Sequence, residues 1–206
     1  MRGGISAAAS AAFLLALSLG GCDQRGDDSS TGELANGTAT VAKHYEGPKP
    51  EGVSSTQDAV TTTFYIPQAS ISDMYEIEAS ELALVRARRP EVKAFAKMMI
   101  ADHGKSSADL KRFVAENPVN IAPAQQLDAR RRAMIVNLEQ AGDAEFDREY
   151  VGQQSAAHDE AYNLHQSYAN RGDYPALKER AKAVAAIVAR HREHVKTLDR
   201  EITGSR

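Results

Sequence analysis

The chain has 206 residues, of which 42% are hydrophobic, 26% charged and 6% aromatic, with one cysteine and no tryptophan. Its 25 lysines and arginines against 28 acidic residues give a formal charge of -3, which provides no basic surface for binding nucleic acid. A single cysteine excludes an internal disulfide and a cysteine-based zinc site. Any metal site therefore has to use histidines and carboxylates.

The first 21 residues have the features of a secretory signal peptide. Arg2 gives a basic start, a short apolar run covers residues 7–19, and small residues precede Cys22. The sequence LGGC at residues 19–22 resembles the bacterial lipobox, in which the chain is cut before a cysteine that becomes lipidated. We expect Cys22 to anchor the protein to a membrane of the bacterial cell envelope, on its periplasmic side. The alternative is an ordinary cleaved signal with an incidental cysteine.

Residues 22–57 are rich in Gly, Ser, Thr, Asp and Pro and contain few large apolar side chains. Such a segment buries too little surface to offset the entropy lost on ordering. We therefore expect a signal peptide at 1–21, a lipidated cysteine and flexible linker at 22–57, and a folded domain at 58–203.

Prolines and glycines divide the folded domain into helical segments. Beyond residue 64, every proline stands where a helix is expected to begin or end, and Gly142 and Gly172 are placed as helix ends. We expect helices at about 67–88, 91–116, 124–141, 144–170 and 175–202. No segment alternates with a period of two, so the fold class is all-α, with antiparallel packing favoured by short connections.

Histidines occupy apolar faces of three predicted helices. In the last helix the apolar stripe, at spacings of three and four, contains His191, with His194 close by. In the second helix His103 continues the stripe of Val92, Ala96 and Met99. In the fourth helix an inward sector that is partly polar contains Asp147, Gln154, His158 and His165.

The first predicted helix offers two candidate buried carboxylates. The residues Ile71, Met74, Leu82 and Val85 define its apolar direction. Glu78 points along that direction, whereas Glu76 points nearly the opposite way. Periodicity thus predicts that Glu78 is the buried carboxylate.

Two interpretations of the inward histidines remain open. Imidazoles from facing helices can bind a metal ion, and a set dominated by histidine suits zinc or copper. Alternatively, neutral buried histidines form a structural network with carbonyls or with carboxylates such as Glu78, Asp102 or Asp147. Ferritin-type di-iron chemistry is disfavoured because no Glu-x-x-His sequence is present.

Recognisable catalytic motifs are absent from the sequence. It contains no P-loop, GxGxxG, HExxH or GxSxG sequence, and lipidation would consume its one cysteine. No enzymatic activity is therefore indicated.

Several short sequence motifs occur in a characteristic order along the chain. They are Tyr65-Ile66 with Ala69, Glu76-Ile77-Glu78, Glu91 to Ala96 with Met99 and Asp102-His103, Phe146-Asp147-Arg148-x-Tyr150, His158, Leu177-Lys178 and Arg192-Glu193-His194. Together they resemble the bacterial domain-of-unknown-function 4142 family. The resemblance implies a secreted or lipid-anchored, ferritin-like four-helix bundle plus one shorter helix, with no established activity. It matches Glu76 rather than Glu78 in the first helix, and His194 rather than His191 in the last.

Two functions from different classes follow from these observations. The first is an envelope-anchored helical lipoprotein, without enzymatic activity, that serves as a binding or stress-related accessory module. The second is a metalloprotein for storage, sensing or oxidant handling. Its candidate ligands for a divalent metal, zinc or copper, are Glu76, Glu78, His103, His158, His191 and His194. The expected partner is a membrane, through the lipid anchor; the sequence identifies no protein partner.

Overall fold

The computed structural model describes residues 60–204, which form five helices and contain no strand. The helices are α1 (Thr62–Arg86), α2 (Pro90–Glu116), α3 (Ala129–Gln140), α4 (Phe146–Arg171) and α5 (Pro175–Gly204). The all-α prediction is confirmed. The predicted signal peptide, Cys22 and the linker to residue 57 lie outside the described residues. None of the helices within residues 60–204 combines the length and the hydropathy of a membrane-spanning segment.

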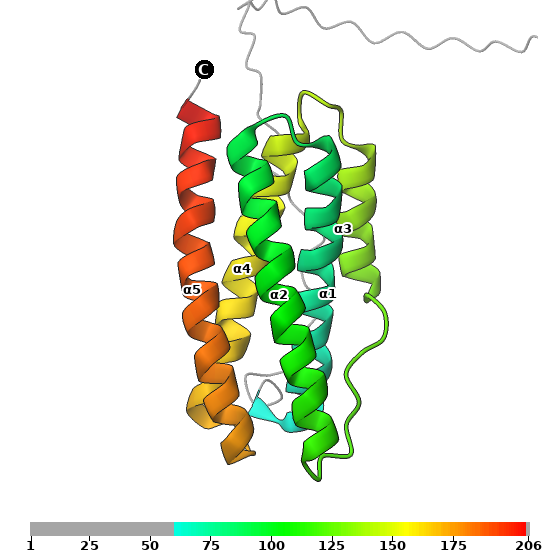
Figure 1. Cartoon of the computed structure of the whole chain (residues 1–206), viewed down its shortest axis with the longest axis vertical. Helices are drawn as coiled ribbons and strands as arrows, with labels where there is room; N and C mark the ends of the chain where they lie inside the picture. Colours follow the sequence, from blue (N-terminus) through cyan, green and yellow to red (C-terminus); the bar gives the residue numbers. More distant parts are fainter. Residues whose placement is uncertain (1–59, 205–206) are drawn as a thin grey trace, which may run out of the picture. The chain divides into compact units, whose positions relative to one another are not determined.

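Four long helices form an antiparallel bundle, and the shorter α3 packs against α1 and α4 (Figure 1). Each of α1 and α5 neighbours both α2 and α4, so that α2 and α4 lie on a diagonal. These two helices run in the same direction because residues 117–128 and α3 return the chain along the bundle before α4 begins (Figure 1). One such crossover is the connection pattern of ferritin-like bundles.

Two helix starts differ from the sequence prediction. Helix α1 begins at Thr62 rather than near Pro67, because the Thr61 side chain accepts a hydrogen bond from the Phe64 backbone N–H at 3.3 Å. Pro67 lies inside the helix, where its fixed φ is compatible with the helical backbone. Helix α3 begins at residue 129 rather than 124, because Asp128 caps it through the Arg131 N–H at 2.7 Å.

Side chains from other elements close the turns at one end of the bundle. Arg86 donates to the backbone carbonyls of Leu138 and Ala141 at 2.6 and 2.5 Å, at the C-terminal end of α3. The buried Asp147 of α4 accepts hydrogen bonds from the backbone N–H groups of Arg88 and Arg89 at 3.0 and 2.9 Å. These bonds join the α1–α2 turn to α3 and α4.

At the other end, Gly172 follows α4 with a φ of -56°, which any residue adopts. Its lack of a side chain is required for a different reason. A Cβ at this position would lie 2.6 Å from the Tyr168 ring.

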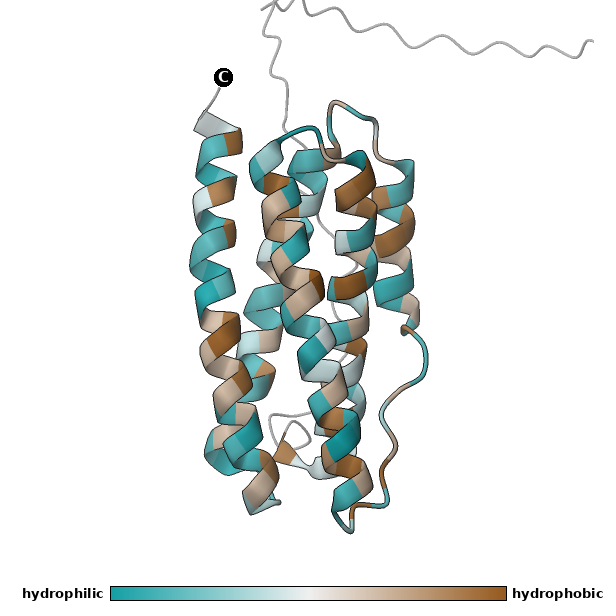
Figure 2. Cartoon of the chain, viewed as in Figure 1, coloured by the Kyte–Doolittle hydropathy of each residue, from teal (hydrophilic) through white to brown (hydrophobic). Residues whose placement is uncertain are grey.

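Two apolar clusters fill the two ends of the bundle interior. Polar and apolar residues alternate around each helix (Figure 2), and the apolar sides face inward. One cluster contains Phe95, Met99 and Tyr150, and the other contains Tyr65 and Leu110. Along each long helix, buried polar residues lie between the stretches that belong to the two clusters, together with a small third apolar cluster of Ala161, Val184 and Val188 on α4 and α5. The middle of the bundle therefore contains a buried polar centre.

Candidate metal centre

Three buried histidines meet in this polar centre, one from each of three helices. His103 lies on α2, His158 on α4 and His191 on α5, and each is at most 4% exposed. Their ring centroids are 5.4 to 5.7 Å apart. Each ring contributes one nitrogen atom to a set of three that all lie within 4.8 Å of one another. Nitrogens bound to one ion at about 2.0–2.1 Å are about 3.5 Å apart, so small ring movements bring all three onto a common ion.

Each of these rings is held through one nitrogen by a fixed acceptor. His103 Nδ1 bonds to the Asp73 carboxylate at 2.8 Å, and His158 Nδ1 donates to the Gln154 carbonyl at 2.9 Å. His191 Nε2 bonds to the Asp102 carboxylate at 2.9 Å. Carbonyl and carboxylate oxygens accept hydrogen bonds, so these nitrogens carry the protons.

The second nitrogen of each neutral ring is consequently a lone-pair donor. Among residues 60–204, His103 Nε2, His158 Nε2 and His191 Nδ1 have no hydrogen-bond partner. Metal-binding histidines commonly donate their other N–H to a carboxylate or carbonyl, which fixes the ring and its tautomer. The three rings have this arrangement.

Burial keeps two of the rings neutral. It lowers the pKa of His158, and it lowers the pKa of His191 to about 4, despite the hydrogen bond of His191 to Asp102. Both rings are thus in the form that binds metal at neutral pH.

The third ring differs. Burial acts to lower the pKa of His103, but its hydrogen bond to Asp73 and the negative charges of Asp73 and Glu76 outweigh this effect. The pKa of His103 is therefore raised.

Buried polar atoms without partners concentrate at this centre. Within residues 60–204, eight such side-chain atoms belong to the three histidines, Asp73, Glu76 and Gln154. A buried polar atom without a partner is costly, so this concentration indicates a place where a ligand supplies the missing interactions.

On α1, the carboxylate that lies beside the histidines is that of Glu76 rather than Glu78. Glu76 is fully buried, and its Oε1 lies 3.6 Å from His158 Nδ1. The periodicity-based prediction of a buried Glu78 is wrong, because that side chain is 37% exposed and pairs with Arg132 of α3. The apolar direction behind that prediction was defined in part by Val85, which is 80% exposed and therefore does not mark the inner face of α1.

On α5, His191 is the histidine that lies in the centre. His194 is exposed, and its ring meets the edge of Phe95 at a centroid distance of 5.2 Å. Of the six candidate ligands, His103, His158 and His191 therefore converge, Glu76 adjoins them, and Glu78 and His194 lie elsewhere.

Two other inward residues of α4 have separate roles. His165 is buried and bonds through Nδ1 to the Tyr65 hydroxyl at 2.8 Å, and burial lowers its pKa to about 4. Asp147 binds the α1–α2 turn rather than a histidine.

Sequence reasoning missed Asp73, which holds His103. The signal that identifies it is a stripe of small and polar residues at alternating spacings of four and three along α1. This stripe is buried and consists of Ala69, Asp73, Glu76, Ser80 and Ala83. Small side chains allow close helix packing, so the stripe marks the inner face of α1 better than its large apolar residues do.

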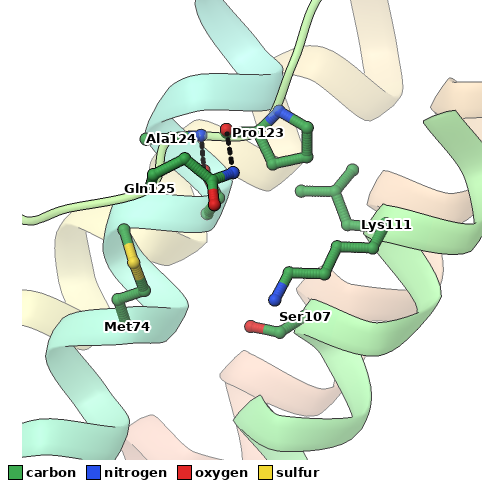
Figure 3. Close-up of a pocket in the computed structure, with 8 residues that line it drawn as sticks. Met74, Ser107, Lys111, Pro123, Ala124 and Gln125 are labelled. Atoms are coloured by element: carbon green, nitrogen blue, oxygen red, sulfur yellow. Dashed lines mark hydrogen bonds between the residues drawn. The ribbon is translucent and has the colours of Figure 1, made fainter.

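A surface hollow of about 110 Å³ lies between α1, α2 and the 117–128 connection (Figure 3). Hydrogen bonds from Ala124 N to Ser70 Oγ and from Gln125 Nε2 to Pro123 O hold the connection in place. None of the lining residues belongs to the histidine cluster. The hollow is small compared with typical ligand pockets of about 300–1,000 Å³, so the histidine cluster is the stronger candidate site.

Fold and site together define a helical bundle with a buried three-histidine centre. The chain belongs to the family described as "Domain of unknown function (DUF4142)", whose model matches residues 47–198. This finding confirms the resemblance seen in the sequence. No curated protein gives a significant match.

Two solved structures share the fold. One is described as "CopM in the Cu(II)-bound form", with 20% identity and a TM-score of 0.56, covering 68% of this chain and 97% of that one. The other is a DUF305 fragment from Deinococcus radiodurans, with 10% identity and a TM-score of 0.59, covering 71% and 97%.

Proposed function

We propose that this protein is an envelope-anchored lipoprotein that binds one transition-metal ion between α2, α4 and α5. The ligands are the free nitrogens of His103, His158 and His191. The observation that carries the proposal is the meeting of three buried rings whose other nitrogens are already used by fixed acceptors. Neutral rings in this arrangement turn lone pairs toward a common space, and a cation satisfies all three.

Copper is the favoured metal, with zinc as the alternative. Imidazole nitrogen binds both ions, and affinity for a given nitrogen site generally rises to a maximum at Cu(II). The fold is also shared by a protein whose structure is described as Cu(II)-bound. A purely structural network is the competing explanation, but it leaves the three free nitrogens without a hydrogen-bond donor.

Elemental analysis of the full-length protein, purified without an affinity tag or chelator, tests the metal site. After exposure to Cu(II) and removal of excess ion, we expect about one equivalent per chain in the wild type. Replacing His191 by alanine should remove most of it. The matched control is His194→Ala, which changes an exposed histidine one turn away on the same helix. Wild-type protein that retains no copper or zinc, or equal retention in the two variants, rejects the site.

The envelope location rests on the sequence around Cys22 and is tested separately. Mass spectrometry of the mature protein from its native host should detect lipid on Cys22, and Cys22→Ser should move the protein out of the membrane fraction. Membrane association that survives this substitution contradicts a lipid anchor. In the proposed arrangement, the linker holds the metal-binding bundle near the membrane, where it serves metal storage, sensing or oxidant handling.

A further inference from the structure

Glu76 is the most unusual charged group in the bundle. It lies on α1 with no exposed surface, and neither carboxylate oxygen accepts a hydrogen bond from any group within residues 60–204. The adjacent His158 Nδ1, 3.6 Å away, donates to the Gln154 carbonyl instead. A buried carboxylate held by neither a donor nor a formal cation is costly, which indicates that a positive charge is supplied when the centre is filled.

The second acidic group at the centre is Asp73, which is 1% exposed and holds His103. The other buried side chains with formal charges in the described part of the chain have partners elsewhere. Asp147 accepts backbone N–H groups, and Arg131 pairs with Glu160 at 2.8 Å. Asp102, which holds His191, is 40% exposed, so that water screens its charge. Once a metal ion has displaced any proton from the three rings, Asp73 and Glu76 are therefore the two buried negative charges beside three neutral ligands.

We propose that Glu76 determines which ions this centre accepts. Its negative charge favours a divalent cation over a monovalent cation such as Cu(I) or Ag(I). The inference rests on the proposed function. Glu76 acts through its charge on an ion held by the histidines, since its carboxylate is not part of the converging set. It is a specificity-determining residue rather than a ligand.

The reason is the charge balance of a buried site. A divalent ion brings the sum of its charge and those of Asp73 and Glu76 to zero, whereas a monovalent ion leaves one buried negative charge uncompensated. Charges interact strongly in such an interior, and an uncompensated one is costly. Removing the charge of Glu76 reverses the balance, so that the monovalent ion becomes the neutral combination.

The substitution Glu76→Gln preserves the shape of the side chain and removes its charge. Competition titrations of the full-length protein with Cu(II), and with Cu(I) or the redox-inert Ag(I), measure the two affinities. We expect the ratio of Cu(II) to Cu(I) affinity to fall at least about tenfold, which corresponds to a rise of about 59 mV in the copper reduction potential. The matched control is Glu78→Gln, two residues away on the same helix and half-exposed, which should leave the ratio unchanged.

The outcomes separate this inference from the proposed function. If the wild type binds neither copper nor zinc, the metal site itself fails. If the wild type binds Cu(II) but Glu76→Gln lowers the affinities for Cu(II) and Ag(I) equally, or changes neither, the metal site stands and the charge-matching role is overturned. Should circular dichroism show that this variant does not fold, Asp73→Asn removes the other charge and is expected to shift the ratio in the same direction. An unchanged ratio there overturns the inference.

Discussion

Asp73 shows how a single carboxylate prepares a histidine for metal binding. It is buried on α1, and its Oδ1 lies 2.8 Å from His103 Nδ1 on α2. The hydrogen bond fixes the ring orientation and places the proton on Nδ1 of the neutral ring. Nε2 is left as the nitrogen available to an ion.

Replacing Asp73 by alanine should therefore weaken metal binding without removing a ligand. Loss of such a partner typically lowers metal affinity by about 10- to 100-fold, and we expect a loss in this range for Asp73→Ala, measured by competition with a chromophoric chelator. The control is Asp109→Ala, which removes a partly exposed carboxylate that pairs with Arg112 on α2. Equal affinities for the two variants would show that Asp73 does not orient the ligand.

How well the sequence predicts individual site residues depends on the helix. The stripe of α5 predicts a buried His191 because its neighbours Val184, Val188, Val195 and Leu198 are unambiguous core residues. On α1 the same method fails. The inner face there consists of small and polar side chains, and Val85, used to define that face, is 80% exposed.

The pairing of Asp73 with His103 was beyond prediction for a different reason. The two residues are 30 positions apart and lie on different helices. Their contact depends on how far α1 and α2 are shifted and rotated relative to each other. Periodicity places a residue on a face, but it does not fix that relative register.

At the scale of the elements, one arginine holds the end of α3. Arg86, in the last turn of α1, donates to the carbonyls of Leu138, Glu139 and Ala141 at 2.5 to 2.9 Å, and its guanidinium lies 4.8 Å from the centroid of the Phe146 ring. The final carbonyls of a helix have no partners within the helix. Within α3 the Ala141 N–H reaches only the Leu138 carbonyl, at 3.3 Å. Arg86 therefore supplies from α1 partners that the end of α3 does not provide for itself.

Removing this side chain should destabilise the domain. Hydrogen bonds that involve a charged group contribute about 1.5–3 kcal/mol to stability, so we expect Arg86→Ala to lower the free energy of unfolding by about 2 kcal/mol in urea denaturation. The control is Arg88→Ala, because Arg88 is exposed and contributes its backbone N–H to Asp147, which alanine retains. A loss below about 0.5 kcal/mol, typical of neutral surface changes, would contradict the capping role of Arg86.

The number and order of helices follow from the sequence because prolines, glycines and apolar periodicity mark each of the five segments. The start of α1 does not follow from the same signals. A proline favours a helix start, and inside a helix its missing N–H removes one backbone hydrogen bond, but its fixed φ is helical. The helix nevertheless begins at the cap Thr61, which outweighs the signal of Pro67. Such competition between two local signals is decided by the hydrogen bonds of the folded chain.

At the scale of the whole molecule, a histidine outside the metal centre makes folding sensitive to acid. His165 is 2% exposed and bonds to the Tyr65 hydroxyl. Burial lowers its folded-state pKa to about 4, while the unfolded chain has the ordinary pKa of about 6.5. Between these values the unfolded state binds more protons than the folded state. The contribution of neutral His165 to the free energy of unfolding is therefore fully present above pH 6.5 and is lost as the pH falls toward 4.

We expect the metal-free protein to lose on the order of 1–2 kcal/mol of stability through this residue between pH 6.5 and pH 5. Urea denaturation at several pH values measures the loss. His165→Gln removes the titrating ring while keeping a hydrogen-bonding side chain beside Tyr65. Between pH 6.5 and pH 5 the stability of this variant should therefore fall by about 1–2 kcal/mol less than that of the wild type. Identical pH dependence in the two proteins would mean that the folded state accommodates a protonated His165.

Metal binding should stabilise the bundle as a unit, because the three histidines come from α2, α4 and α5. A ligand present at 100 times its dissociation constant stabilises the folded state by about 2.7 kcal/mol if it does not bind the unfolded chain. For a domain of this size, we expect a rise of about 8 °C in the melting temperature with Cu(II) or Zn(II). The rise should disappear in His191→Ala and persist in His194→Ala. Hydrogen exchange locates the effect: metal should slow exchange around His191 in α5, where a direct link to α2 and α4 restrains the helix. A melting temperature that rises equally in both variants would place the stabilising ion somewhere other than the three-histidine centre.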